Sequence, residues 1–270
     1  MKLIFFSKTP CCSTADELIE LGNEIGVDGF DLCVRKGHAV TPEEATKKLP
    51  LMVETLRKAG FEVPMVTGPA VLYDPSNTVA RNLIAATGDC GIGLFKLCYF
   101  YPDQSPYWEQ IERYRRRLHD FAEVGRRHQV KVCYHTHCDC IGHGTAALMH
   151  LLKDQDPEWL GAYLDTAHVR LAGEPWDLAL QIVKEYLSIV AVKDVSYEIE
   201  GGRASNTRCF PPAPEGLVDW KSVVGELKKQ AYTGPASVHA EFTKQFPSAP
   251  DFLRAAKRQV AFLREIISIS

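Results

Sequence analysis

The sequence has no long uninterrupted apolar segment and no excess of charge of one sign. Its 270 residues carry 31 Lys and Arg against 34 Asp and Glu, so the formal net charge is only -3. No global field would therefore draw the chain to phosphate backbones or anionic lipid. No stretch approaches the roughly 18 apolar residues that span a bilayer, and Lys8 and Pro10 break the apolar start without a signal-peptide cleavage pattern. We expect neither a nucleic-acid partner nor a membrane location.

The chain also lacks the cysteine spacing of a disulfide framework or a structural zinc site. It has nine cysteines, an odd number, and Cys11 and Cys12 are adjacent. These features favour reduced thiols and a cytoplasmic location. The Cys and His residues from Cys133 to His143 contain no C-x-x-C knuckle, and half of them fall in a predicted strand whose alternate residues face opposite ways. This cluster therefore does not indicate a structural zinc ion.

Short apolar runs separated by longer amphipathic stretches recur along the chain and predict an α/β fold. Segments such as 109–128 and 220–230 carry Leu, Val and Phe at helical spacing. Eight parallel strands close a (β/α)8 TIM barrel, which takes about 250 residues. We predict one TIM barrel domain over residues 1–270. Its predicted strands are Leu3–Phe6, Gly29–Val34, Glu62–Val66, Leu94–Phe100, Lys131–His135, Gly161–Leu164, Ser188–Val192 and Ala236–Ala240.

One connection, from Ser196 to Asp219, is far longer than a strand-to-helix loop usually needs. It is rich in Gly, Pro, Ser and Asn and follows the seventh predicted strand, so it would lie over the catalytic face of a barrel. A disordered insertion is the alternative. We expect a substrate cover that makes Arg208 available to an anionic or hydroxyl-rich ligand.

Polar residues gather at the ends of four predicted strands. In a barrel of parallel strands the C-terminal ends converge on one mouth, where active sites lie. Imidazole and carboxylate groups from different strands would meet there and form a ligand set that suits Mn, Mg, Co or Zn. These residues are His135 and His137 on strand five, Asp165 and His168 on strand six, Lys193 and Asp194 on strand seven, and His239 and Glu241 on strand eight.

Five short motifs follow one another along the chain. They are GVDGFDL at 26–32, LDTAH at 164–168, VKD at 192–194, EGLVDW at 215–220 and AEF at 240–242. Together they resemble the sugar isomerase, epimerase and inosose dehydratase branch of the xylose-isomerase-like barrels. The resemblance covers nearly the whole chain and rests on the order of the motifs.

The resemblance implies one divalent metal, held by Glu, Asp, His and Glu at the ends of strands five to eight. Asp165 and Glu241 match by position. The strand-five position holds His135, in a YHTH segment that is similar to the Tyr-His-x-His of inosose dehydratases, and the strand-seven position holds Ala191, which cannot bind an ion. The predicted ligands are His135, Asp165, Glu241 and His239, with His168 or Asp194 as alternatives that would complete the set.

The resemblance also implies catalytic roles. Glu241 stands where one of the two catalytic glutamates of that family lies, and His135 stands in place of the other. Histidine can shuttle protons near neutral pH. Lys193 would stabilise an enediolate. The alternative for Lys193, and equally for Lys96, is that each neutralises a barrel carboxylate, since an unpaired ammonium within an apolar strand is costly.

Further polar and aromatic residues near the predicted mouth are candidates for substrate binding. Aromatic rings there could form an apolar wall against a sugar, although packing in the core or rim is their usual role. A single His at a strand end is likewise more often a hydrogen-bonded structural residue. The predicted binding residues are His137, His168, Lys96, Arg208, Tyr99 and Trp108.

The predicted function is an isomerase or epimerase that acts on a small polyhydroxy carbonyl compound by metal-assisted proton transfer. A lyase of the inosose dehydratase kind is the first alternative, because the YHTH segment favours it. An endonuclease-IV-like enzyme would need further His and carboxylate ligands. A non-catalytic sugar-binding barrel is the alternative from another class. The sequence is compatible with a homo-oligomer.

Overall fold

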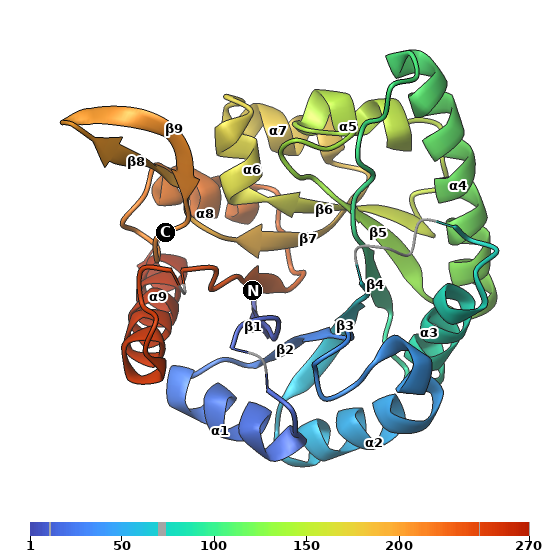
Figure 1. Cartoon of the computed structure of the whole chain (residues 1–270), viewed down its shortest axis with the longest axis horizontal. Coiled ribbons are helices and arrows are strands. Elements are labelled where there is room, and N and C mark those ends of the chain that lie inside the picture. Colours follow the sequence, from blue (N-terminus) through green and yellow to red (C-terminus); the bar gives the residue numbers. More distant parts are fainter. Residues whose placement is uncertain (11, 70–73, 243, 270) are drawn as a thin grey trace.

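The computed structural model of the chain describes residues 1–10, 12–69, 74–242 and 244–269. Within these residues eight parallel strands close into a barrel in the order β1-β10-β7-β6-β5-β4-β3-β2, with helices packed around its outside (Figure 1). The barrel strands are β1 (Leu3–Phe6), β2 (Gly29–Cys33), β3 (Glu62–Thr67), β4 (Leu94–Leu97), β5 (Lys131–His135), β6 (Leu160–Asp165), β7 (Leu187–Val192) and β10 (Ala236–Val238). The predicted (β/α)8 TIM barrel is confirmed.

Helices follow the barrel strands in turn. They are α1 (Ala15–Ile25), α2 (Ala45–Lys58), α3 (Thr78–Asp89), α4 (Tyr107–Arg127), α5 (Thr145–Leu152), α6 (Thr166–Leu171), α7 (Trp176–Val183), α8 (Trp220–Lys229), α9 (Ala249–Ile269) and the short 3-10 helix η1 (Pro42–Glu44). Each longer helix buries an apolar stripe against the strands, as the spacing of Leu, Val and Phe predicts. In the described part of the chain, no helix combines the length and the apolar composition needed to cross a bilayer.

All eight predicted strands are present, with ends that differ by up to three residues. The largest difference is at β4, predicted to run to Phe100 but ending at Leu97. Beyond Leu97 the backbone N–H of Phe100 donates to the Tyr134 hydroxyl at 2.9 Å, so a side chain takes the place of a neighbouring strand there.

Side chains from alternate strand positions fill the inside of the barrel. They form a buried cluster distinct from the larger core between strands and helices, made of Ile4, Met65, Cys133, Tyr163, Ile189 and Ala191. Since alternate residues share a face, the positions two residues after Cys133, Tyr163 and Ala191 also face inward. The barrel geometry therefore aims His135, Asp165 and Lys193 at the C-terminal mouth.

The long connection after β7 is an ordered hairpin. Its strands β8 (Ser196–Glu200) and β9 (Arg203–Cys209) pair antiparallel around Gly201 and Gly202, both of which adopt positive φ. The hairpin rises from the barrel, with its tip away from the strands (Figure 1). Of the connection that was predicted to cover the substrate, only the base of the hairpin, at the end of β9, therefore lies near the barrel mouth.

Candidate active site at the barrel mouth

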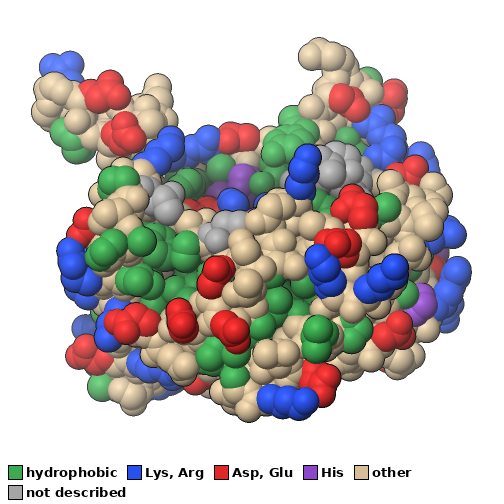
Figure 2. All heavy atoms as spheres, turned by 60° about the horizontal axis from the view of Figure 1, so that its bottom comes forward, with side chains coloured by type: hydrophobic (Ala, Val, Ile, Leu, Met, Phe, Trp, Pro, Cys, Tyr) green, Lys and Arg blue, Asp and Glu red, His purple; other side chains and the backbone are tan. Residues whose placement is uncertain are grey.

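A charged cluster occupies the C-terminal mouth of the barrel. The Lys193 ammonium lies 3.2 Å from Glu241 Oε2 and 3.5 Å from Asp165 Oδ2, and His135 Nε2 lies 3.2 Å from the same Asp165 oxygen. Histidine side chains are visible in the hollow beside the raised hairpin in Figure 2. The structure thus brings together residues of β5, β6 and the ends that follow β7 and β10.

Asp165 organises this cluster because its two oxygens serve different partners. Oδ1 caps α6 by accepting the backbone N–H groups of Ala167 and His168 at 2.9 and 3.2 Å. Oδ2 faces His135 and Lys193. The cap fixes the first turn of α6, so the His168 ring also reaches the mouth, with Nε2 3.0 Å from Lys193 Nζ and 3.8 Å from Asp165 Oδ2.

Burial and mutual charge set the protonation states of the cluster. Burial alone would raise the pKa of the Asp165 and Glu241 carboxyls, but the positive neighbours, with Lys193 the largest among them, together outweigh it and hold the pKa of Asp165 below, and that of Glu241 well below, the ordinary value. Burial alone would lower the pKa of Lys193, but Asp165 and Glu241 raise it above the ordinary value. Both carboxylates and the ammonium are therefore charged at neutral pH.

The imidazoles of the mouth are neutral. Burial first, and nearby lysine charge second, holds the pKa of His135, His168 and His239 well below the ordinary value. The same two causes lower the pKa of His137 to about 4. At neutral pH these rings offer lone pairs for hydrogen bonds, protons or metal ions.

Lys96 lies deeper than Lys193. Its ammonium is 4.4 Å from the Phe6 ring centroid and 4.3 Å from that of Tyr163. Burial lowers its pKa, and the Asp31 carboxylate opposes that shift. Of the two roles predicted for Lys96, this position favours that of counter-charge to a barrel carboxylate.

Asp31 is a buried interior residue to which sequence reasoning gave no role. Its carboxylate accepts hydroxyl hydrogen bonds from Thr67, Tyr163 at 3.1 Å and Ser237 at 3.0 Å. The sequence feature that could have identified it is a carboxylate within the apolar run of β2, because a buried charge must be paired.

The predicted aromatic candidates divide between mouth and exterior. The Tyr99 ring stacks on His137 with centroids 4.0 Å apart, and His137 lies 4.1 Å from the His168 ring. Trp108 is 62% exposed and contacts Tyr107 and His150 instead. Its place in the first turn of α4 puts it on the outside of the barrel, away from the cluster.

A pocket of about 530 Å³ opens beside Glu241. The base of the hairpin forms one side of it: Phe210 lies 4.4 Å from the Lys193 ammonium, and the Arg208 guanidinium pairs with Asp139 at 2.5 Å. Lys8, which donates to Glu241 Oε1 at 2.7 Å, forms another side. Lys8, Arg208 and Lys244 line this pocket together with Glu198 and Glu241, and Glu241 is the member of the charged cluster that lines it.

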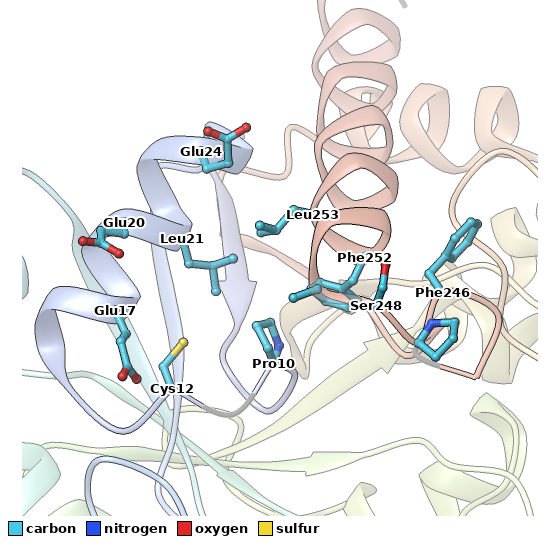
Figure 3. Close-up of a pocket in the computed structure, with 12 residues that line it drawn as sticks. Pro10, Cys12, Glu17, Glu20, Leu21, Glu24, Phe246, Ser248, Phe252 and Leu253 are labelled. Atoms are coloured by element: carbon cyan, nitrogen blue, oxygen red, sulfur yellow. The ribbon is translucent and has the colours of Figure 1, made fainter.

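A separate hollow of about 560 Å³ lies between α1 and α9 (Figure 3). Glu17, Glu20 and Glu24 of α1 border it, and Leu253 lines it from α9. None of the clustered residues of the mouth lines it, so we place the candidate site at the mouth.

The Asp194 carboxylate is hydrogen-bonded mainly to the loop that follows the hairpin. Its two carboxylate oxygens accept the backbone N–H groups of Val195, Gly216 and Val218 and the indole N–H of Trp220, at 2.8 to 3.1 Å. The VKD and EGLVDW motifs therefore form one structural unit. Asp194 is not free to complete a metal site.

Asp194→Ala should lower the free energy of unfolding by about 3 kcal/mol, because it leaves buried N–H groups without an acceptor. Urea denaturation measures this loss. Asp219→Ala is the control: Asp219 caps α8 through Ser222 N–H, and loss of a helix cap costs about 1 kcal/mol. Equal losses in the two variants would show that Asp194 is no more than a local cap.

Three donors at the mouth lie close enough to hold one metal ion. The ligand atoms of His135, Asp165 and His168 are within 4.8 Å of one another. A second such group is His137, Cys138 and His168. Of the other predicted ligands, Glu241 contacts Lys8 and Lys193, and His239 Nε2 contacts the Tyr163 hydroxyl at 2.7 Å.

Comparison with known proteins agrees with this architecture. Over 263 residues the chain is 24% identical to an inosose dehydratase of Lacticaseibacillus casei. The aligned region covers 84% of this chain and 86% of that protein. Among solved structures, the IolI protein with a bound zinc atom matches with a TM-score of 0.78 at 15% identity, covering 99% of this chain and 98% of the other. A D-tagatose 3-epimerase-like protein matches with a TM-score of 0.76 at 17% identity, covering 100% and 98%.

A family model also matches residues 19–266. This match confirms the resemblance carried by the five motifs. The chain belongs to the xylose isomerase-like TIM barrel family.

Proposed function

We propose that this chain is an enzyme that moves a proton on the carbon beside the carbonyl group of a small polyhydroxy compound, as an isomerase or epimerase. One observation carries the proposal: an ionised Glu241, which lines a pocket at the barrel mouth, lies 3.2 Å from the charged Lys193. The proteins named above support the substrate class, since they include an epimerase-like protein and an inosose dehydratase.

The protonation states suggest how the residues divide the work. Glu241 is ionised and accepts the proton from carbon, and the Lys193 ammonium neutralises the enediolate oxygen that forms. Lys193 also carries a transferable proton. If that proton goes to the opposite face of the carbon, the product is an epimer. The proton on Glu241 then passes to Lys193 across their 3.2 Å contact and restores both groups.

A lyase uses the same groups with one difference. The Lys193 proton goes to a neighbouring hydroxyl, which leaves as water, and the substrate loses one hydrogen and one hydroxyl group. The YHTH segment around His135 and the inosose dehydratase relatives favour this second candidate. In both reactions we assign neutral His135 and His137 to hydrogen bonds with substrate hydroxyls, beside the Tyr99 ring.

Product analysis tests the proposal. The protein is incubated separately with D-tagatose, D-fructose and inosose. The products are separated, and their masses are measured by mass spectrometry. An isomer of unchanged mass supports the epimerase, and loss of one water supports the lyase. Tight binding without any product would contradict both and favour a sugar-binding barrel.

The donors His135, Asp165 and His168 fit one divalent ion, since two imidazoles and one carboxylate are a common open set. A bound ion would polarise the substrate carbonyl. Lys193 lies 3.0 Å from His168 Nε2 and 3.5 Å from Asp165 Oδ2, so its ammonium competes with an ion for the same donors.

Zinc titration followed by elemental analysis tests this metal site. We expect one equivalent in the unaltered protein and none in Asp165→Asn, which keeps the α6 cap. Lys193→Met should bind zinc about tenfold or more tightly, because the competing ammonium is gone. No zinc in the unaltered protein, or equal zinc in Asp165→Asn, would exclude the site.

A further inference from the structure

A chain of hydrogen bonds runs from the barrel interior to the mouth. The Asp31 carboxylate contacts the Tyr163 hydroxyl at 3.1 Å, and that hydroxyl contacts His239 Nε2 at 2.7 Å. All three residues are at least 98% buried. They come from β2, β6 and the end of β10, so the closed barrel itself sets their spacing.

Asp31 determines which group donates and which accepts in this series of hydrogen bonds. The Asp31 carboxylate accepts hydrogen bonds from the hydroxyl groups of Thr67, Ser237 and Tyr163. Burial raises the pKa of this carboxyl above its ordinary value, and the Lys96 charge and these hydroxyl groups oppose that shift. Tyr163 has one hydroxyl hydrogen. If it is donated to Asp31, the short contact with His239 requires the imidazole to donate from Nε2.

The other ring nitrogen of His239 is left over. Nδ1 is buried and has no hydrogen-bond partner among the described residues. A buried polar atom without a partner is costly unless a ligand supplies one. The ring packs at 4.6 Å on Phe6, which limits its rotation toward another partner.

We propose that Asp31 and Tyr163 are positioning residues that hold the proton of His239 on Nε2, so that Nδ1 stays an acceptor for a hydroxyl hydrogen of the bound substrate. Only the part of this inference that concerns a substrate hydroxyl group rests on the proposed function. The tautomer follows from the hydrogen-bond chain whether or not a sugar is turned over. A buried carboxylate that fixes a catalytic tautomer has a known counterpart in hydrolase triads.

Nitrogen-15 NMR of the imidazole groups tests the tautomer in the protein as purified. The His239 signals are assigned by their loss in His239→Gln. We expect the neutral tautomer with the proton on Nε2. A proton on Nδ1 in the unaltered protein would overturn the proposal.

Asp31→Asn should reverse the tautomer, because the amide can donate to the Tyr163 oxygen and turn its hydroxyl hydrogen toward His239 Nε2. Thr67→Val is the matched control, since it removes a donor to the other Asp31 oxygen, Oδ1, while Tyr163 contacts Oδ2. We expect reversal in Asp31→Asn and none in Thr67→Val. An unchanged tautomer in Asp31→Asn, or reversal in both variants, would contradict the proposal.

Tyr163→Phe provides a second test should Asp31→Asn fail to fold. It leaves Asp31 with the Thr67 and Ser237 donors and removes the acceptor of His239 Nε2–H. The Nε2–H proton should shift upfield by loss of its hydrogen bond, and an unchanged shift would overturn the proposal. Deuterium exchange into D-tagatose or inosose should fall on the order of a hundredfold in Asp31→Asn. No exchange with the expected tautomers would instead contradict the proposed function alone.

Discussion

Glu241→Gln should lower kcat on the order of a hundredfold or more, which corresponds to about 3 kcal/mol of lost transition-state stabilisation. The substitution keeps the shape of the side chain and removes the charge that accepts the proton. Because Lys193 retains Asp165 as a partner at 3.5 Å, the fold should be preserved. Steady-state kinetics and thermal unfolding measure the two effects separately.

Glu198→Gln is the matched control for this substitution. Glu198 lines the same pocket as Glu241 but is exposed on β8. We expect its kcat to stay within about threefold of that of the unaltered protein. Near-normal turnover in Glu241→Gln would show that Glu241 is structural. Unfolding of that variant would show that it serves mainly as a partner of Lys193.

Lys193→Met should be the most destabilising substitution at the mouth. The Lys193 side chain is 3% exposed and pairs with Asp165 and Glu241. Its loss strands buried negative charge, which costs about 3 to 5 kcal/mol at neutral pH. Turnover should also be lost, since the variant has no ammonium to stabilise an enediolate.

The pH dependence of this loss identifies its cause. In the unaltered protein the pKa values of Asp165 and Glu241 lie below their ordinary values. The stability they contribute is therefore present above an unfolded pKa of about 4 and is lost as pH falls through the folded values. Without Lys193 the folded pKa values rise, so the difference between the proteins should be largest near pH 7, shrink as pH falls, and disappear only below the lowered folded pKa values of the unaltered protein.

Urea denaturation with a chelator from pH 4 to pH 8 measures this difference without interference from bound metal. Lys8→Met is the control: Lys8 pairs with Glu241 but its side chain is 42% exposed, so its loss should cost less than about 1 kcal/mol. A loss in Lys193→Met that does not change with pH would indicate a packing defect rather than stranded charge.

The barrel could be predicted from the sequence because each strand is a short apolar run between amphipathic stretches. The same pattern also predicted that several mouth residues lie at the C-terminal ends of strands and point into the barrel. His135 and Asp165 close their strands, and the two-residue repeat places them on the inner face. The structure adds their partners, which depend on strands distant in sequence.

Residues whose role depends on long-range partners could not be assigned from local pattern. Asp194 follows a strand just as Asp165 does, yet it holds a loop more than twenty residues away. Asp31 lies within a motif used for family resemblance, but its donors come from β3, β6 and β10. Trp108 lies close in sequence to β4, and the direction of α4 turns it outward.

Hydrogen exchange with solvent tests the central proposal most directly. The protein is incubated in deuterium oxide with D-tagatose, D-fructose or inosose, and deuterium on the carbon beside the carbonyl group is followed by NMR. The account predicts incorporation at that carbon with the unaltered protein and a loss on the order of a hundredfold with Glu241→Gln. Incorporation at the same rate with Glu241→Gln, or none with the unaltered protein on any of these compounds, would contradict it.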